Sequence, residues 1–325
     1  MNLIDVNKKL QTEDQCLDFL EKVRWPDGIV RCPECGNEKV SRITRTVDET
    51  KSRKDKKQNK RTRLYACLEP TCKYRFTPTV GTMFHDSHLP LAKWFAAVAL
   101  IVHAKKGMSA LQMQRHLGVN YRTAWYMGHR IRKAMAEPSG ITVRELLPRP
   151  KLSGIVEVDE TYVGGKQKGK GVYYGKKQKA VVIGIRERGG DLRFIHTSDA
   201  KANSVQPVVT ANVSPDVRAI MTDEAQIYPW ILRRTGLEDR HAVIEHKFNK
   251  YVSGEVHTNT VESAFSLFKR GIVGSFHKVS HKHLHRYLSE FEYRFNGREE
   301  PDLFGSTVAR MVGSKEMKYA ELVAE

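Results

Sequence analysis

Gly154-Ile-Val-Glu-Val-Asp-Glu-Thr-Tyr-Val-Gly-Gly165 is the stretch that decides the fold of this 325-residue chain. Branched and aromatic residues dominate it and a glycine pair ends it, which is typical of a β-strand. Side chains alternate between the two faces of a strand, so Glu157 and Asp159 share one face and Glu160 points to the other. The sequence thus places the carboxylate of Asp159 on an apolar strand.

Two further acidic residues occupy informative positions later in the chain. Asp223 closes the apolar run Arg-Ala-Ile-Met-Thr-Asp-Glu, and Glu224 after it is expected to face solvent. Glu262 lies in the first turns of a predicted helix, with Lys269 two turns later on the same face. Two strand-borne aspartates and one helix-borne glutamate can hold a pair of divalent cations for in-line attack on a phosphodiester. Three unrelated structural acids are the alternative interpretation.

The pattern around these acids predicts an α/β domain. Three strands come first, the last two joined by a Gly-Gly turn. Alternating helices and short strands follow, and two helices close the domain. The predicted strands are 155–163, 179–188, 192–197, 217–222 and 242–245, and the predicted helices are 203–212, 227–235, 261–269 and 281–295. This is the element order of the ribonuclease-H-like fold, which carries its carboxylates on the first strand, the fourth strand and a late helix.

Four of the five cysteines form two close pairs, Cys32 with Cys35 and Cys67 with Cys72. In a reducing compartment such pairs are metal ligands more often than disulfides. The spacing C-x2-C and C-x4-C suits tetrahedral zinc, although it leaves zinc and iron undistinguished. A closed four-cysteine site has no open coordination position, so its role is expected to be structural. The fifth cysteine, Cys16, is expected to be a small buried residue.

The charge of the chain points to a polyanionic partner. The formal net charge is +18 and the sequence pI is about 9.7. Such a field favours nucleic acid or an anionic membrane surface.

The longest apolar run, 94–104, is far shorter than the roughly 20 residues that span a bilayer. The N-terminus lacks the pattern of a secretory signal. We therefore expect a cytoplasmic, nucleoid-associated protein that binds double-stranded DNA and no membrane.

Residues 109–135 have the pattern of a helix-turn-helix, preceded by an apolar helix over 91–104. A short helix, a Gly-containing turn and a longer Arg-rich helix follow one another. The basic face of the third helix would enter the major groove. The candidate DNA contacts on this helix are Tyr121, Arg122, His129 and Arg130. A helical bundle for packing or dimerisation is the alternative interpretation.

Two Lys-rich segments are further candidates for contact with DNA. One runs from residue 51 to residue 63, between the two cysteine pairs, and is interpreted as a basic loop of the metal module. The other is a Gly- and Lys-rich hairpin tip that follows Asp159 and contains Lys166 and Lys168. Each phosphate that such a tip neutralises adds salt-sensitive affinity. A solvated loop without DNA contacts is the alternative for the hairpin tip.

Three motifs together resemble a known family. They are Val158-Asp-Glu-Thr-Tyr-Val-Gly-Gly-Lys166, Thr222-Asp-Glu-Ala225, and a long motif that starts at His257-Thr-Asn-Thr-Val-Glu-Ser263 and ends at Tyr293-Arg-Phe-Asn296. The chain from about residue 32 to residue 298 resembles bacterial insertion-sequence transposases of the ISXO2-like branch, which begin with a zinc ribbon.

The resemblance implies a DDE-type enzyme on a ribonuclease-H-like fold. Asp159, Asp223 and Glu262 would bind Mg2+ or Mn2+, and Lys269 would be the basic residue on the helix of the third ligand. Some members of this branch use asparagine at the third position, so Asn259 remains an alternative ligand. The enzyme would bind the terminal inverted repeats of its element, cleave there and join the 3′-hydroxyls to target DNA. A homodimer or larger synaptic assembly is expected, because two ends are held together.

Four regions follow from these assignments. They are a zinc ribbon with its basic loop (1–85), a helix-turn-helix module with a linker (86–150), the catalytic domain (151–298) and a peripheral C-terminal tail (299–325). Two alternatives to an active transposase stay open. One is a transposase-derived DNA-binding protein without catalytic activity, and the other is a ribonuclease-H-like nuclease such as a junction resolvase.

Overall fold

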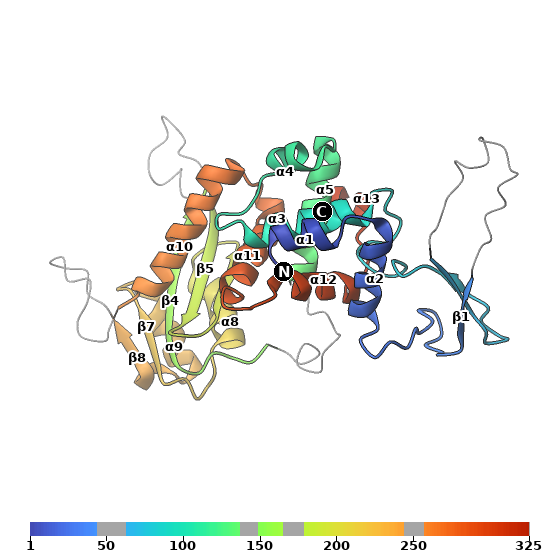
Figure 1. The fold of residues 1–325 in the computed structure, drawn as a ribbon. Helices are drawn as coiled ribbons and strands as arrows, with labels where there is room; N and C mark the ends of the chain where they lie inside the picture. Colours follow the sequence, from blue (N-terminus) through green and yellow to red (C-terminus); the bar gives the residue numbers. More distant parts are fainter. Residues whose placement is uncertain (44–62, 137–148, 165–178, 244–256, 325) are drawn as a thin grey trace, which may run out of the picture. The chain divides into compact units, whose positions relative to one another are not determined.

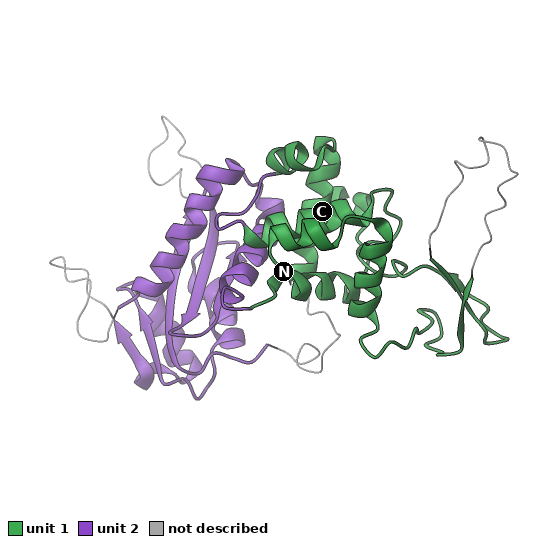
Figure 2. Cartoon of the chain, in the orientation of Figure 1, with its two compact units in different colours: residues 1–103, 110–146, 301–325 green, residues 104–109, 147–300 purple. Residues whose placement is uncertain are grey.

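The structure is a computed structural model that describes most of the chain (Figure 1). The described residues are 1–43, 63–136, 149–164, 179–243 and 257–324. Most of the linker, nearly all of the basic loop, and Lys166 and Lys168 in the hairpin tip therefore lie outside the described residues. The chain divides into two compact units (Figure 2). Unit 1 comprises residues 1–103, 110–146 and 301–325, and unit 2 comprises residues 104–109 and 147–300.

Unit 1 begins with two capped helices and a small sheet. Thr12 and Gln15 form a capping box at the start of the second helix, which satisfies amide groups that a helix N-terminus leaves without partners. The helices are α1 (Leu3–Lys9) and α2 (Glu13–Arg24), and the strands are β1 (Val40–Ile43), β2 (Leu64–Cys67) and β3 (Arg75–Phe76). The sheet is antiparallel in the order β1-β2-β3. Trp25, Tyr65 and Phe76 pack together with Cys32 and Cys67 beside it.

The rest of unit 1 is helical. Its helices are α3 (Leu91–His103), α4 (Ala110–Leu117), α5 (Tyr121–Ala136), α12 (Leu303–Gly313) and α13 (Tyr319–Ala324). The segment that was expected to be a peripheral tail instead supplies α12, whose Phe304, Val308 and Met311 are fully buried. The ring of Phe304 packs edge-on against Phe95 of α3. The C-terminal segment is thus part of the core of unit 1.

Unit 2 is built on a mixed five-stranded sheet in the order β6-β5-β4-β7-β8. The strands are β4 (Ile155–Val163), β5 (Ala180–Glu187), β6 (Leu192–Thr197), β7 (Ala219–Thr222) and β8 (His241–Val243). The first three are antiparallel, and β7 and β8 continue parallel to β4. The predicted strands are confirmed, with two of them matching the predicted bounds at both ends.

Helices cover both faces of this sheet (Figure 1). They are α8 (Ala202–Asn212), α9 (Ile227–Thr235), α10 (Asn259–Gly271) and α11 (His281–Asn296), with a π-helical turn, η3 (Ile272–Phe276), after α10. Val156 and Val158 of β4 pack with α8 and α9 on one face. Val163, on the other face, packs with α10 and α11. Since side chains alternate along β4, Asp159 points toward the face that α10 covers.

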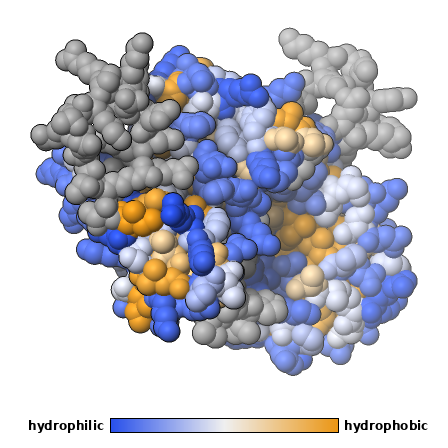
Figure 3. All heavy atoms as spheres, turned by 90° about the vertical axis from the view of Figure 1, so that its right-hand side faces the viewer, coloured by the Kyte–Doolittle hydropathy of each residue, from blue (hydrophilic) through white to orange (hydrophobic). Residues whose placement is uncertain are grey.

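The face of the protein that Figure 3 shows is mainly hydrophilic. In the view of Figure 3, hydrophilic residues cover most of the face and apolar residues form separate patches. Among the described residues, no helix combines the length and the apolar character that a bilayer-spanning segment needs.

Candidate active site

Asp159 and Asp223 lie on neighbouring parallel strands. The register of β4 and β7 pairs Ile155 with Ala219 and Glu157 with Met221. When this register is continued by two residues, Asp223, the first residue after β7, stands opposite Asp159. Neighbouring strands lie about 4.8 Å apart, so the two carboxylates are held close together.

Glu262 is supplied by the first turn of α10. The hydroxyl of Thr258, the N-cap residue, donates to Glu262 Oε1 at 2.9 Å, which restrains the carboxylate. Val261 and Phe265 of the same helix are buried against the sheet, so its polar face is left exposed. A carboxylate at residue 262 therefore lies beside the strands that carry the two aspartates.

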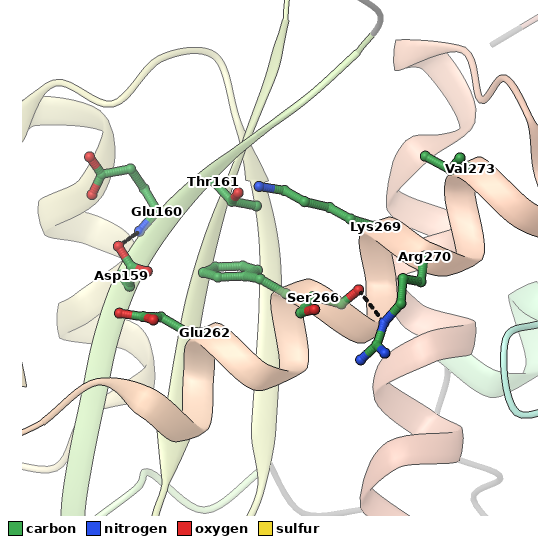
Figure 4. Close-up of a pocket in the computed structure, with 9 residues that line it drawn as sticks. Asp159, Glu160, Thr161, Glu262, Ser266, Lys269, Arg270 and Val273 are labelled. Atoms are coloured by element: carbon green, nitrogen blue, oxygen red, sulfur yellow. Dashed lines mark hydrogen bonds between the residues drawn. The ribbon is translucent and has the colours of Figure 1, made fainter. Parts of the chain in front are cut away.

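Asp159 and Glu262 line one cavity of about 590 Å3 (Figure 4). Asp159 and Glu262 point toward one another across it, and Lys269 extends toward β4 from two turns further along α10. The lining residues are Asp159, Glu160, Thr161, Glu262, Phe265, Ser266, Lys269, Arg270 and Val273. The carboxylates of Asp159 and Glu262 thus share this space with Lys269 and Arg270, whereas the carboxylate of Glu160 is bound to Tyr228 on the opposite face of the sheet. Phe265 and Val273 form an apolar wall.

Burial and neighbouring charge make Asp159 an unusual acid. Burial, and after it the charges of Glu160, Asp223 and Glu262, raise the pKa of Asp159 to about 7. The amide of Glu160 partly opposes this rise by donating to the carboxylate. Removal from water and like charges both favour the protonated form of a carboxyl group. A cation among these groups would reverse that preference, as cation-binding sites do.

The other acids near Asp159 are turned away from it. Glu160 accepts a hydrogen bond from Tyr228 Oη of α9 at 2.7 Å, on the opposite face of the sheet, as the alternation predicts. Glu224 is exposed, as predicted. Glu157 shares the face of Asp159 but is fully buried, and its carboxylate accepts from backbone amides at the start of α10. Apart from the strand face that Glu157 shares with Asp159, no pattern in the sequence predicts this contact.

In unit 1 the four paired cysteines converge. Their ligand atoms all lie within 4.8 Å of one another. Cys32 Sγ lies 3.8 Å from Cys72 Sγ, and Cys35 Sγ lies 3.6 Å from Cys67 Sγ. Zn–S bonds of about 2.3 Å in a tetrahedron place sulfur atoms about 3.8 Å apart, so the cluster fits a zinc ion.

Two knuckles present these thiols. Gly36, with φ of 74°, allows the first knuckle to turn, and its amide donates to the carbonyl of Cys32 at 2.9 Å. In the second knuckle the amide of Cys72 donates to the carbonyl of Glu69. Asn37 Nδ2 donates to Glu69 Oε2 at 2.9 Å and thereby ties the two knuckles together.

Two family models match this chain. Residues 151–296 match the ISXO2-like transposase domain, and residues 11–75 match the transposase zinc-ribbon domain. The chain thus contains an ISXO2-like transposase domain and a transposase zinc ribbon. It is also 27% identical over 304 residues, 88% of this chain and 92% of the other, to an uncharacterized protein in the transposable element ISH50 of Halobacterium salinarum.

The two matches coincide with the two sites. The residues matched to the transposase domain, 151–296, include every residue that lines the carboxylate cavity. The zinc-ribbon match covers all four clustered cysteines of the chain.

Two of the four predicted DNA contacts on α5 are wrong. Tyr121 and Arg122, in the first turn of the helix, are exposed. His129 is 0% exposed and Arg130 is 4% exposed, so neither is available to a base edge in this protein. The guanidinium of Arg130 lies over the rings of Trp94 and Tyr126 and donates to the carbonyl of His85.

The cover over this face of α5 comes from the C-terminal segment. Tyr319 of α13 contacts the rings of both Trp125 and Tyr126. Arg310 of α12 donates to the carbonyl of Met135 at 2.9 Å. The first turn of α5 keeps Tyr121 and Arg122 at the surface, and the Arg122 guanidinium rests there on the ring of Tyr319.

Proposed function

We propose that this protein binds the terminal inverted repeats of its insertion sequence, cleaves DNA at the element ends and joins the 3′-hydroxyls to target DNA. The observation that carries the proposal is the convergence of Asp159, Asp223 and Glu262, from two strands and one helix, beside the ammonium group of Lys269. The transposase domain that the chain contains supports the same reading.

The donor set fits Mg2+ or Mn2+, because carboxylate oxygens are the ligands that these hard cations prefer. The three carboxylates are not all within 4.8 Å of one another, as the ligands of a single ion would be. A two-metal site spans more, since its ions lie about 3.5–4 Å apart. Bound here, such a pair would supply activation of the attacking hydroxyl and stabilisation of the leaving oxygen.

The chain's own groups would bind and orient the DNA strand. Lys269 and Arg270 are exposed at the cavity and carry the charge that binds phosphate oxygens. Glu262 lines the cavity, whereas Asn259 is not among the residues that line it, which favours Glu262 as the third ligand. The apolar wall of Phe265 and Val273 would exclude water from one side of the reacting phosphodiester.

The arrangement of unit 2 supports a ribonuclease-H-like fold. Three antiparallel strands lead into parallel strands, helices lie on both faces, and the acids occupy β4, the end of β7 and α10. In unit 1, we assign DNA contact to Tyr121 and Arg122 at the start of α5, within a helix-turn-helix formed by α4 and α5. The zinc ribbon, and Lys166 and Lys168 outside the described residues, would add contacts to phosphates.

The proposed reaction also implies an oligomeric state and a cellular location for the protein. Two element ends react together, so we expect a homodimer or a larger synaptic complex. A chromosomal DNA substrate implies a cytoplasmic, nucleoid-associated protein, which agrees with the net charge of +18.

Cleavage of a labelled duplex tests the proposal. The duplex carries the terminal repeat of the element, and wild type is compared with Glu262→Gln in Mg2+. Nicking at the repeat boundary by wild type alone is the expected result. Specific binding without nicking would instead favour a catalytically inactive DNA-binding derivative. Cleavage of branched DNA that lacks the repeat would favour a resolvase.

A further inference from the structure

Glu157 is a buried carboxylate that the proposed reaction does not use. It lies on β4, two residues before Asp159, and is 0% exposed. We propose that Glu157 is a positioning residue, which fixes the start of α10 on β4 and thereby sets the separation of Glu262 from Asp159. This inference rests on the proposed function, because it assigns the two positioned carboxylates to one cation site.

One oxygen of Glu157 caps α10. Glu157 Oε2 accepts from Thr260 N at 2.9 Å, from Thr260 Oγ1 at 2.7 Å and from Val261 N at 3.0 Å. The first amides of a helix have no partner within the helix, and the helix dipole favours a negative charge there. The N-cap residue itself, Thr258, makes no capping hydrogen bond to the helix backbone. The cap of α10 therefore comes from the neighbouring strand.

The other oxygen of Glu157 is held by Arg188, beside the ring of His257. Arg188 Nε donates to Glu157 Oε1 at 2.7 Å, and His257 Nδ1 lies 3.2 Å from the same oxygen. Arg188 Nη2 also donates to the carbonyl of His257 at 2.7 Å. The carboxylate is thus fixed between the segment that enters α10 and the turn that follows β5. A buried charge with both oxygens engaged in this way has a defined position.

Through these contacts Glu157 links the two proposed metal ligands, Asp159 and Glu262, over a few residues. Asp159 is the next residue on the same face of β4, and Glu262 directly follows Val261. Gly184 on β5 permits the close approach of α10, because a Cβ atom there would lie 2.5 Å from a ring carbon of Phe265. The backbone of α10 and the backbone of β4 are therefore joined at the point where their acidic side chains meet. A shift of α10 by about 1 Å would change the distance between the carboxylates of Glu262 and Asp159 by a similar amount. Displacements of this size strongly lower the activity of catalytic sites.

The same contacts distinguish Glu157 from a metal ligand. Its sequence position, on the face of Asp159, would allow it to bind a cation. Its oxygens are instead occupied by two amides, a hydroxyl and a guanidinium. A positioning role needs an acceptor oxygen toward α10, whereas a ligand role needs the negative charge. Glutamine keeps the acceptor toward α10 and loses the charge, and its NH2 group takes the place of the oxygen that accepts from Arg188.

Titration with Mn2+ separates these roles. The zinc-loaded full-length protein is titrated with Mn2+, and free Mn2+ is followed by electron paramagnetic resonance. Glu157→Ala is expected to weaken Mn2+ binding at least tenfold, and Glu157→Gln to stay within about threefold of wild type. Circular dichroism and end-DNA binding should match wild type in both variants, and the Mg2+ concentration for half-maximal cleavage should rise in Glu157→Ala alone.

A milder variant covers the case in which Glu157→Ala does not fold. Thr260→Val removes the 2.7 Å hydroxyl bond and leaves the two amide bonds in place. We expect it to weaken Mn2+ binding two- to fourfold. Thr210→Val, at an exposed position of α8, is the matched control and should bind Mn2+ like wild type.

Three outcomes would contradict the inference. Wild-type Mn2+ affinity in both Glu157→Ala and Thr260→Val would exclude a positioning role. Equal loss of binding in Glu157→Ala and Glu157→Gln would assign Glu157 as a ligand instead. Mn2+ binding by wild type that Asp159→Asn leaves unchanged would overturn the proposed function itself, and the inference with it.

Discussion

Asp223 stands opposite Asp159 when the parallel register of β4 and β7 is continued beyond Glu157 and Met221. The charge of Asp223 contributes to the raised pKa of Asp159, which agrees with their proximity. Asp223 lies at a strand end, where its Oδ1 accepts from the amide of Ala225 at 3.1 Å. The two aspartates therefore share one edge of the sheet although 64 positions of sequence separate them.

The neighbouring acids Asp223 and Glu224 provide a matched pair of variants. Asp223→Asn should lower the rate of end cleavage about a thousandfold, since loss of charge at a cation site removes several kcal/mol of transition-state stabilisation. Glu224→Gln removes the same charge from an exposed side chain and should leave the rate unchanged. Single-turnover cleavage assays measure the rates of both variants. Equal rates would contradict the assignment of Asp223 as a metal ligand.

The raised pKa of Asp159 predicts a pH-dependent stability of the metal-free site. In the unfolded chain an aspartate titrates near 3.9, whereas burial raises the pKa of Asp159 in the folded protein to about 7. The stability that this group contributes is complete below pH 4 and is lost as the pH rises through 7. Asp159→Asn should therefore stabilise the protein by roughly 2–3 kcal/mol more at pH 8 than at pH 5, at about 1.4 kcal/mol per pH unit.

Chemical denaturation without added Mg2+, followed by hydrogen exchange in the strands of unit 2, measures this difference. Glu224→Gln is the control for the loss of one negative charge. Added Mg2+ should raise the stability of wild type at pH 8 and leave Asp159→Asn unchanged. A stabilisation by Asp159→Asn that is equal at both pH values would contradict the assignment.

The zinc content should depend on the clustered cysteines alone. Cys32→Ser should reduce zinc from about one ion per chain to nearly none, because a serine hydroxyl is a poor replacement for a thiolate ligand. Cys16→Ser should retain the ion, since Cys16 is buried on α2 and its thiol donates to the carbonyl of Leu10. Elemental analysis of the purified proteins distinguishes the two. Full zinc occupancy in Cys32→Ser would exclude the ribbon site.

Substitutions of Arg122 and Arg130 should affect different properties of the protein, DNA discrimination and stability respectively. Arg130→Met removes a buried guanidinium that lies over two rings and donates to a carbonyl, so unit 1 should lose about 2 kcal/mol of stability. Arg122→Ala should cost about 1–3 kcal/mol of discrimination between the terminal repeat and random DNA, the value of a direct base contact. Thermal unfolding and competition binding test the pair. If Arg122→Ala distinguished the terminal repeat from random DNA as well as wild type does, the proposed role of α5 in end recognition would be wrong.

The secondary structure of unit 2 was largely predictable because its signals are local. An alternating apolar strand, glycine turns and short apolar runs mark β4 (155–163), β6 (192–197) and α9 (227–235), whose predicted and observed bounds agree. The same alternation correctly separated the faces of Glu160 and Asp159. The approach of Glu262 to Asp159 could not be derived from periodicity, since it depends on how α10 packs on the sheet.

The predictions from the sequence that are wrong or incomplete concern contacts between distant parts of the chain. The Arg-rich pattern of α5 predicts an exposed basic face, but Trp94 and the segment 303–324 cover much of this helix. Helical periodicity identifies one apolar face and does not reveal that a later segment covers a second one. The role of Glu157 was missed for a related reason, because its partners Thr260 and Val261 follow it by about a hundred residues.

The return of α12 to unit 1 has a consequence for synthesis on the ribosome. Phe304, Val308 and Met311 leave the exit tunnel only after all of unit 2 has been translated. The core that supports α5 can therefore close only once the cavity-bearing unit has emerged. A gene copy that is interrupted within unit 2 would leave its N-terminal fragment without this helix and unable to complete the fold. Such fragments would be poor competitors for element ends, and functional end binding would be restricted to chains that also carry the carboxylates.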